Sequence, residues 1–178
     1  MKSILVLGLG RFGRHLAHEL QELGNDVMVI DKDEELVERF SGIFTDAQIG
    51  DCTDEGVIRS LGVNQFDVVF VTICDDFQSS LVATSLVRQF GARQVVAKAK
   101  QDIQADLLRK IGADEVIYPE KEIAEKVALR YNNGNIFDFI ELTSDYSIYE
   151  IAILPEWVGK SIMELDVRRQ YNINIIGV

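Results

Sequence analysis

Between residues 2 and 131, apolar and polar positions follow one another in blocks that suit strands and helices in turn. The strand-like blocks are mostly apolar, as is typical of parallel strands buried on both faces: "SILVLG", "DVMVID", "FTDAQIGD", "DVVFVTI", "QVVAKA" and "EVIYP". Helix-like periodicity falls between them, over residues 11–23, 34–40, 54–61, 77–90, 104–111 and 121–131. Glycine ends four of these helical blocks, at positions 24, 62, 91 and 112, as a C-cap with positive φ requires. The alternation predicts an α/β fold, a Rossmann-like, doubly wound parallel sheet of six strands.

The alternation stops after Tyr131. We predict a turn at "NNGN", a short amphipathic connecting helix at "IFDFIEL", a strand at "YSIYEIAIL", a helix at "GKSIMELDVRRQ" and the start of another strand at "NINIIGV". We therefore predict two domains. The first is a Rossmann-like nucleotide-binding domain over residues 1–131, and the second is a C-terminal extension over 132–178 into a second, incomplete α+β lobe. Because an apolar strand with unpaired edges is a poor end for a domain, we expect this lobe to be cut short at Val178.

The first strand-like block runs into glycines at positions 8, 10 and 13, with the spacing G-x-G-x-x-G. Gly8 permits a tight turn, Gly10 allows a phosphate to approach the backbone, and Gly13 allows close helix–strand packing. The amide groups of the helix that starts near Arg11 would then point at a bound anion. Asp31 ends the second strand-like block, where an acid binds ribose hydroxyls and disfavours NADP. The sequence predicts a nucleotide site here, and the alternative is a tight turn that binds nothing.

Further candidate residues lie near the carboxyl ends of the strands, which meet along one edge of a parallel sheet. The candidates beyond the glycines and Asp31 are Arg11, Phe12, Lys32, Asp33, Asp51, Cys52, Ile73, Cys74, Asp75, Lys98, Ala99 and Lys100. Lys98 lies inside an apolar block, an expensive place for a cation without a partner, so we expect it to meet phosphate charge. Arg11 suits either contact with phosphate charge or an exposed position in the first turn of the helix. Both cysteines suit packing better than thiol chemistry.

Net charge, apolar runs and cysteine content exclude several classes of function. A net charge of −11 argues against nucleic acid as a partner. The chain has no apolar run of about 18 residues and no cleavable leader pattern, and its two distant cysteines suit a reducing cytoplasm rather than a disulfide or zinc site. His15 and His18 suit surface or packing positions. Since no acid–base constellation or substrate domain accompanies the sheet, we predict no catalytic residue and no enzyme, and favour a sensor. The alternatives are the cofactor domain of an NAD-dependent oxidoreductase and a structural protein with an empty glycine turn.

The blocks "VLGLGRFG", "VIDKDEELVERF", "GDCTDEGVIRSLGV" and "LLRKIGADEVIYPEKEIAEKVA" resemble the RCK (KTN) domain of the TrkA family. They are similar above all to the cytoplasmic regulatory subunits of Ktr/Trk-type potassium uptake systems. Residues 141–178 resemble the first part of the C-terminal lobe of that family. The resemblance implies a homo-oligomeric ring, commonly an octamer, docked from the cytoplasm beneath a membrane-embedded potassium-translocating subunit. It places one ring surface on the fourth and fifth βα units and the other on the helix at 121–131 with "IFDFIEL".

The resemblance also implies that ATP, ADP, NAD⁺ or NADH occupies the crevice, and the arginine of "GLGRFG" favours ATP or ADP. By matching position, Arg11 reaches the phosphates, Asp31 binds the ribose and Lys98 is the lysine of the fifth strand. Glu120 in "YPEKE" matches an acid near the phosphates and a subunit interface. An acid there would repel the phosphates unless Mg²⁺ or Ca²⁺ lay between them, so Glu120 is the candidate metal ligand. The alternative is a helix N-terminal acid stabilised by the helix dipole.

Overall fold

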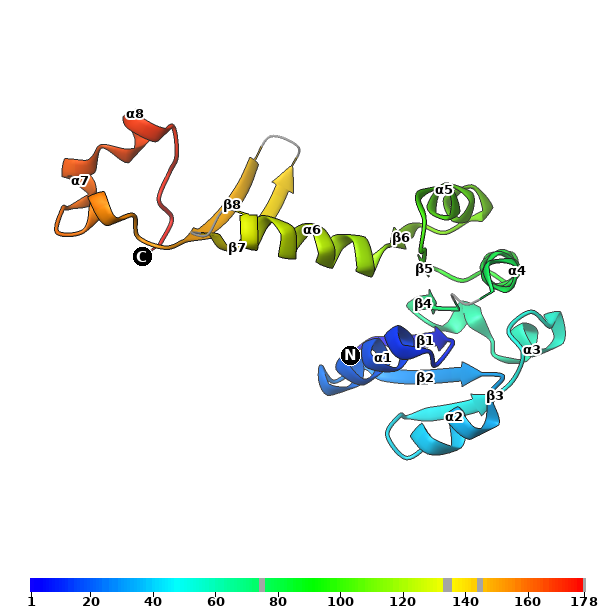
Figure 1. Ribbon diagram of the computed structural model, residues 1–178. Helices are drawn as coiled ribbons and strands as arrows, with labels where there is room; N and C mark the ends of the chain where they lie inside the picture. Colours follow the sequence, from blue (N-terminus) through cyan, green and yellow to red (C-terminus); the bar gives the residue numbers. More distant parts are fainter. Residues whose placement is uncertain (74–75, 133–135, 144–145, 178) are drawn as a thin grey trace. The chain divides into compact units, whose positions relative to one another are not determined.

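A six-stranded parallel sheet organises the first part of the chain in the computed structural model, which describes residues 1–73, 76–132, 136–143 and 146–177 (Figure 1). Its strands are β1 (Ser3–Leu7), β2 (Asp26–Asp31), β3 (Asp46–Ile49), β4 (Val68–Val71), β5 (Val95–Lys98) and β6 (Glu115–Ile117). They are ordered β3-β2-β1-β4-β5-β6, and every neighbouring pair is parallel. The prediction of a doubly wound, Rossmann-like sheet is confirmed. The order reverses between β1 and β4, the position at which such sheets bind ligands.

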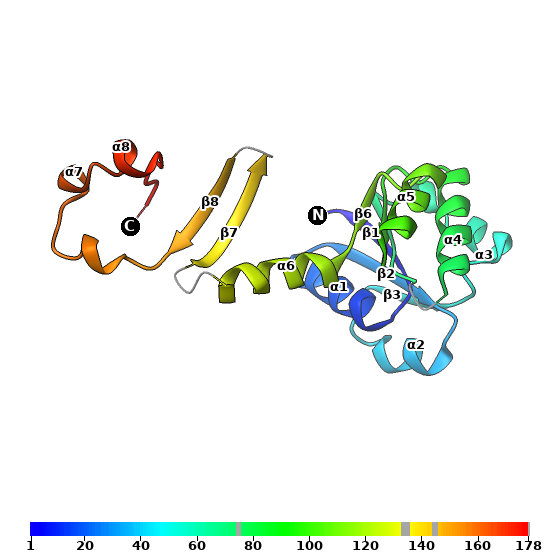
Figure 2. The ribbon, with the colours of Figure 1, turned by 45° about the horizontal axis from the view of Figure 1, so that its top comes forward.

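The helices that connect these strands cover both faces of the sheet (Figure 2). They are α1 (Arg11–Glu22), α2 (Glu34–Phe40), α3 (Glu55–Ser60), α4 (Phe77–Gln89) and α5 (Asp102–Ile111), with a 3₁₀ turn at Val63–Gln65. The larger core cluster joins one face of the sheet to α3, α4 and α5, and the smaller joins the other face to α1 and α2. The positive φ predicted for the glycines that end these helices is confirmed, with +83° at Gly24, +60° at Gly62, +84° at Gly91 and +126° at Gly112.

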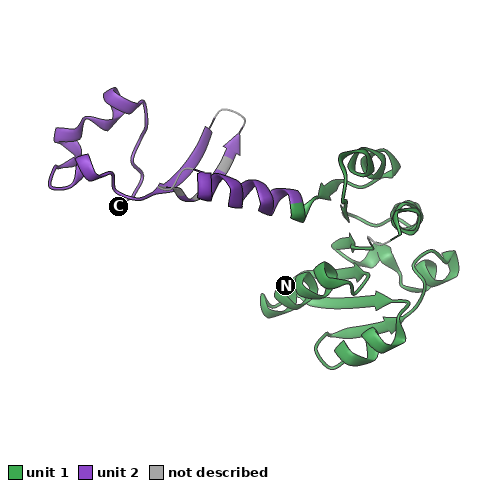
Figure 3. Cartoon of the chain, viewed as in Figure 1, with its two compact units in different colours: residues 1–120 green, residues 121–178 purple. Residues whose placement is uncertain are grey.

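The chain divides into two compact units, Met1–Glu120 and Lys121–Val178 (Figure 3). Helix α6 (Pro119–Asn132) begins at the end of the first unit and supplies the start of the second. The second unit continues with an antiparallel hairpin of β7 (Ile136–Thr143) and β8 (Tyr146–Ile151) and a 3₁₀ turn at Pro155–Trp157. Helices α7 (Ile162–Leu165) and α8 (Val167–Tyr171) follow.

Three sequence-based assignments in the second unit need correction. The "IFDFIEL" segment is strand β7, because its aromatic and β-branched residues pair with those of β8, for example Ile140 with Ile148. The helix predicted over "GKSIMELDVRRQ" is interrupted at Asp166, whose φ of +41° cannot continue a right-handed helix. Residues 172–177 form no strand, since no described strand lies beside them to pair with. Residues 133–135 of the predicted "NNGN" turn lie outside the described part.

One arginine ties three segments of the first unit together at the amino end of β5. The Arg88 guanidinium of α4 donates to the carbonyl oxygens of Gly112 (2.8 Å) and Ala92 (3.2 Å) and pairs with the Asp114 carboxylate. Asp114 also accepts a hydrogen bond from the Val95 amide at 2.7 Å. Burial raises the pKa of Asp114, but these hydrogen bonds outweigh it, so the pKa is lowered overall.

Replacing Arg88 by methionine should therefore lower the free energy of unfolding by about 1–3 kcal/mol, because the two carbonyl groups and Asp114 lose their donor. Urea denaturation measures the difference. The control is Arg93→Met, which removes only an exposed pair with Asp67 (3.1 Å) and should cost less than about 1 kcal/mol. Equal losses from both variants would contradict the role given to Arg88.

Candidate functional site

The glycine turn joins β1 to α1 at the carboxyl edge of the sheet. Gly8 has a φ of +104° and its amide donates to the Ile30 carbonyl at 2.8 Å. A Cβ on Gly13 would lie 2.1 Å from the Gly8 carbonyl oxygen and 2.4 Å from the Thr72 hydroxyl, so α1 approaches the turn more closely than any side chain allows. The roles predicted for Gly8 and Gly13 match this geometry.

Thr72 braces the turn from the end of β4, and it was not among the sequence-based candidates. Its buried hydroxyl lies 3.0 Å from the Leu7 carbonyl oxygen and 2.8 Å from that of Gly8. The Thr72 amide also donates to Leu7 at 2.9 Å. A hydroxyl directly after the wholly apolar strand "VVFV" was the sequence signal that could have revealed this residue.

The N-terminus of α1 carries no capping side chain. The side chains of Asp33, Asp54 and Asp76 cap α2, α3 and α4, whereas α1 begins after Gly10 with no side-chain cap and no acid in its first turn. A Cβ placed on Gly10 would meet no atom within 4 Å. Free amide groups and the positive end of the helix dipole therefore face open space above Gly10, an arrangement that suits a phosphate.

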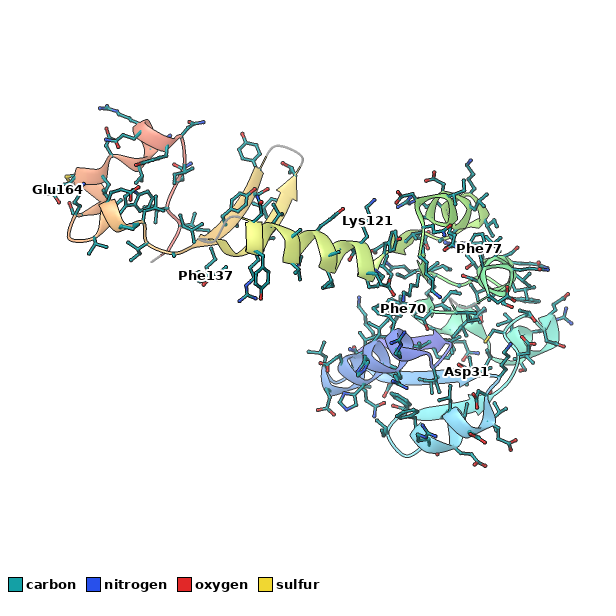
Figure 4. All side chains as sticks on the ribbon, in the orientation of Figure 1. Asp31, Phe70, Phe77, Lys121, Phe137 and Glu164 are labelled. Carbon is teal, nitrogen blue, oxygen red and sulfur yellow. The ribbon has the colours of Figure 1, made fainter. Side chains whose placement is uncertain are left out.

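Asp31, the last residue of β2, faces this turn (labelled in Figure 4). Its Oδ2 accepts a hydrogen bond from the Leu9 amide at 2.6 Å, and its Oδ1 accepts one from the Asp33 amide at 3.0 Å. A carboxylate offers about four acceptor positions, so two remain for ribose hydroxyls. The carboxylate is thus held beside the glycine turn.

Lys98, the last residue of β5, comes to the same edge from the other side of β1. Its neighbours Ala97 and Ala99 belong to the larger core cluster, so strand alternation turns Lys98 toward the face that carries α1. The side chain is only 7% exposed, and its Nζ lies 2.6 Å from Glu120 Oε1 and 5.2 Å from the ring centroid of Phe12. The ammonium group therefore joins α1, β5 and α6.

Glu120 is the second residue of α6, directly after Pro119. The hydrogen bond from Lys98 lowers the pKa of Glu120, and partial burial opposes that effect. In the described residues, no three His, Cys, Asp or Glu side chains gather closely enough to hold a metal ion.

Several other candidates serve local structure. The side chains of Cys52 and Ala99 belong to the larger core cluster, and burial, together with the nearby Asp31 and Asp51, raises the pKa of the Cys52 thiol to about 12. Asp51 accepts hydrogen bonds from the Thr53 amide (2.9 Å) and hydroxyl (2.7 Å), which lower its pKa.

The remaining candidates differ in burial and position. Lys32, Lys100 and Arg11 are exposed, and Arg11 is the first residue of α1. Ile73 is half-buried, and a Cβ on Gly8 would lie 3.2 Å from its side chain. Cys74 and Asp75 lie outside the described residues. The structure thus places Asp31 beside the glycine turn and Phe12, Lys98 and Glu120 in mutual contact, and these residues make up the candidate site.

The fold and the glycine turn define a Rossmann-like domain of the kind built around G-x-G-x-x-G. A family model for the TrkA-N domain matches residues 4–119. Ktr system potassium uptake protein C of Bacillus subtilis (strain 168) is 37% identical over 177 residues, which are 99% of this chain and 80% of the relative. Protein A of the Ktr system of the same organism is 34% identical with the same coverage. The chain belongs to the TrkA-N domain family and is a relative of the Ktr potassium uptake proteins.

Solved structures agree on the fold. The GsuK channel bound to NAD superposes with a TM-score of 0.74 at 19% identity, over 99% of this chain and 32% of that one. The ADP-bound GsuK structure superposes with a TM-score of 0.64 at 19% identity, over 72% of this chain and 34% of that one. No helix in the described part of this chain combines the length and apolar character that a bilayer crossing requires.

The two glycines at the helix start should respond differently to a methyl group. Gly10→Ala should leave the free energy of unfolding within about 0.5 kcal/mol of the parent, because its Cβ enters open space at a φ of −55°. Gly13→Ala should lose about 1–3 kcal/mol or more, since its Cβ would overlap the Gly8 carbonyl. Chemical denaturation of both variants checks this, and similar losses would mean that α1 does not dock as described.

Proposed function

We propose that this chain is a nucleotide-sensing regulatory subunit that assembles as a ring and gates a membrane potassium transporter. The observation that carries the proposal is the open N-terminus of α1 above Gly10, with Asp31 on one side and the buried Lys98 on the other. Such a site binds one negatively charged nucleotide without needing a catalytic group. Its Ktr relatives, named as potassium uptake proteins, support the physiological setting.

The ligand we propose is ATP or ADP, with NAD⁺ or NADH as the second choice. The first turn of α1 and Lys98 would take the phosphates, the exposed Arg11 is free to swing onto them, and Asp31 would accept from the ribose hydroxyls. The negative charge of Asp31 next to the ribose disfavours a 2′-phosphate. Structures of GsuK contain ADP in one case and NAD in another, so this fold accommodates both kinds of ligand.

Mg²⁺ or Ca²⁺ would join Glu120 to the bound phosphates. The Glu120 carboxylate is 59% exposed and so accessible to a hydrated ion, and polyphosphate oxygens would complete the coordination. We propose no chemical turnover at this site. An oxidoreductase would instead consume NADH in steady state, and a spectrophotometric assay of NADH consumption distinguishes the two.

Assembly into a homo-oligomer, with an octameric ring as the form we propose, follows from the apolar side chains that the single chain leaves in water. Helix α6 buries none of its residues, and Ile123, Val127 and Tyr131 repeat at every fourth position along it with 59%, 48% and 81% exposure. Phe137, Ile140 and Leu142 of β7 are also exposed, and a two-stranded hairpin is marginal by itself. In the first unit, Ile103 and Leu107 form a shorter exposed stripe on α5.

Apolar side chains that gather in this way on one element are typical of a binding surface. Copies of the same chain would cover these side chains, and the ring would then act from the cytoplasm on the translocating subunit, at the inner face of the membrane. Nucleotide control requires only that two ring states bind the ligand with different affinities.

A thermal-shift panel with ATP, ADP, NAD⁺, NADH and cyclic di-AMP tests the ligand. Adenine nucleotides at a hundredfold excess over Kd should stabilise the parent by about 2.7 kcal/mol. Gly10→Val should abolish that gain by filling the space above the turn, and Asp31→Ala should weaken binding by about 1–3 kcal/mol. Asp26→Ala, at the exposed start of the same strand, is the control and should bind like the parent. Unchanged binding by both site variants would refute the assignment.

Light scattering tests the assembly. The double variant Ile123→Ser, Val127→Ser should reduce the average mass of the particle, because it removes the centre of the α6 stripe. Leu23→Ser changes one exposed leucine just after α1 and should leave the mass unchanged. A parent protein that stays monomeric at every concentration would contradict the ring.

A further inference from the structure

Lys98 and Glu120 form an ion pair whose two members differ sharply in solvent access. The Lys98 side chain is 7% exposed and the Glu120 side chain 59%, although only 2.6 Å separates Nζ from Oε1. A buried ammonium without an anion is costly, so Lys98 always needs a negative partner. An exposed carboxylate regains its hydration when it turns outward, so Glu120 can leave the pair at little cost.

Phe12 fixes the position of the ammonium group. Its ring lies under Lys98 Nζ at 5.2 Å from the centroid, within the range of a cation–π interaction. Phe12 is also the second residue of α1, in the turn whose amide groups are left open. The cation that neutralises Glu120 is therefore held beside the anion site at the start of α1.

We propose that the Lys98–Glu120 ion pair is an exchangeable latch: a bound phosphate replaces Glu120 as the anion at Lys98 and releases Glu120 from the first turn of α6. The inference rests on the proposed function, because it needs a phosphate ligand at α1. The exchange depends on the ligand, because the buried Lys98 ammonium loses the Glu120 carboxylate only when a phosphate takes its place. A free Glu120 is then the ligand to which a divalent cation binds.

The latch explains how the first turn of α6 can respond to occupancy of the glycine turn. Pro119 and Glu120 open α6, and Lys98 holds that turn against the carboxyl end of β5 only while the pair is formed. The Ala99 amide also donates to the Ile117 carbonyl at 2.9 Å, which keeps β6 in place whether or not the pair is formed. Phosphate binding therefore removes one link between β5 and the start of α6, while the hydrogen bond between β5 and β6 remains.

A double-mutant cycle read by calorimetry tests the latch, with ADP as the ligand and EDTA present to remove divalent cations. Glu120→Gln keeps the shape of the side chain but removes the charge that competes with phosphate, so ADP should bind about fivefold more tightly. In the Lys98→Met background the same change should give no gain, because the competition takes place at Lys98. Lys98→Gln repeats the cycle if the methionine variant fails to fold.

Glu125→Gln is the matched control, since it removes one exposed acid from the same helix and should leave ADP affinity unchanged. A gain that persists in the Lys98→Met background would mean that Glu120 repels the phosphates through space, and the latch would be wrong. Weaker or unchanged binding by Glu120→Gln would overturn it as well. These results leave the proposed function standing as long as the parent binds ADP. If the unmodified protein binds none of ATP, ADP, NAD⁺ and NADH, both the latch and the proposed function are wrong.

Discussion

The docking of α1 on the end of β1 determines where everything else in the site can lie. Gly13 and the Gly8 carbonyl meet at a distance that excludes a Cβ, and the Thr72 hydroxyl holds the same carbonyl from β4. Interiors packed this closely do not deform gradually, so the start of α1 has one position relative to the sheet. Its amide groups consequently lie at the carboxyl edge of the sheet where the strand order reverses, between β1 and β4.

Around that fixed helix end, the charges are arranged to receive an anion. Asp31 is engaged by the Leu9 amide on one side, and Lys98 is buried against Phe12 on the other. Asp31 accepts hydrogen bonds from backbone amides, and Lys98 pairs with Glu120, whose side chain is 59% exposed. In the latch that we propose, this rigid turn and the exchangeable Lys98–Glu120 pair together sense a ligand without transforming it.

The second unit has the opposite character. Its buried apolar side chains among the described residues are Leu165 and Val167, whereas Ile123 and Val127 of α6 and Ile140 of β7 are exposed. A short helix and a two-stranded hairpin gain little stability alone, because most of the stability of such elements comes from packing against something else. In the homo-oligomer that we propose, other copies of the chain would cover the exposed apolar side chains of α6 and β7.

The sequence by itself determined the doubly wound sheet and the glycine turn, because buried parallel strands and a G-x-G-x-x-G turn depend on residue type and local spacing. The same local logic failed at β7, where "IFDFIEL" suits a helix or a strand and the cross-strand pairing with β8 decided between them. Local patterns also gave no reason to select Thr72, which braces the glycine turn. They placed Cys52 in the site, although the Cys52 side chain packs in the core. The partnership of Lys98, Phe12 and Glu120 was decided by the tertiary structure alone, since ion pairs and ring contacts between distant segments depend on how β5, α1 and α6 are brought together.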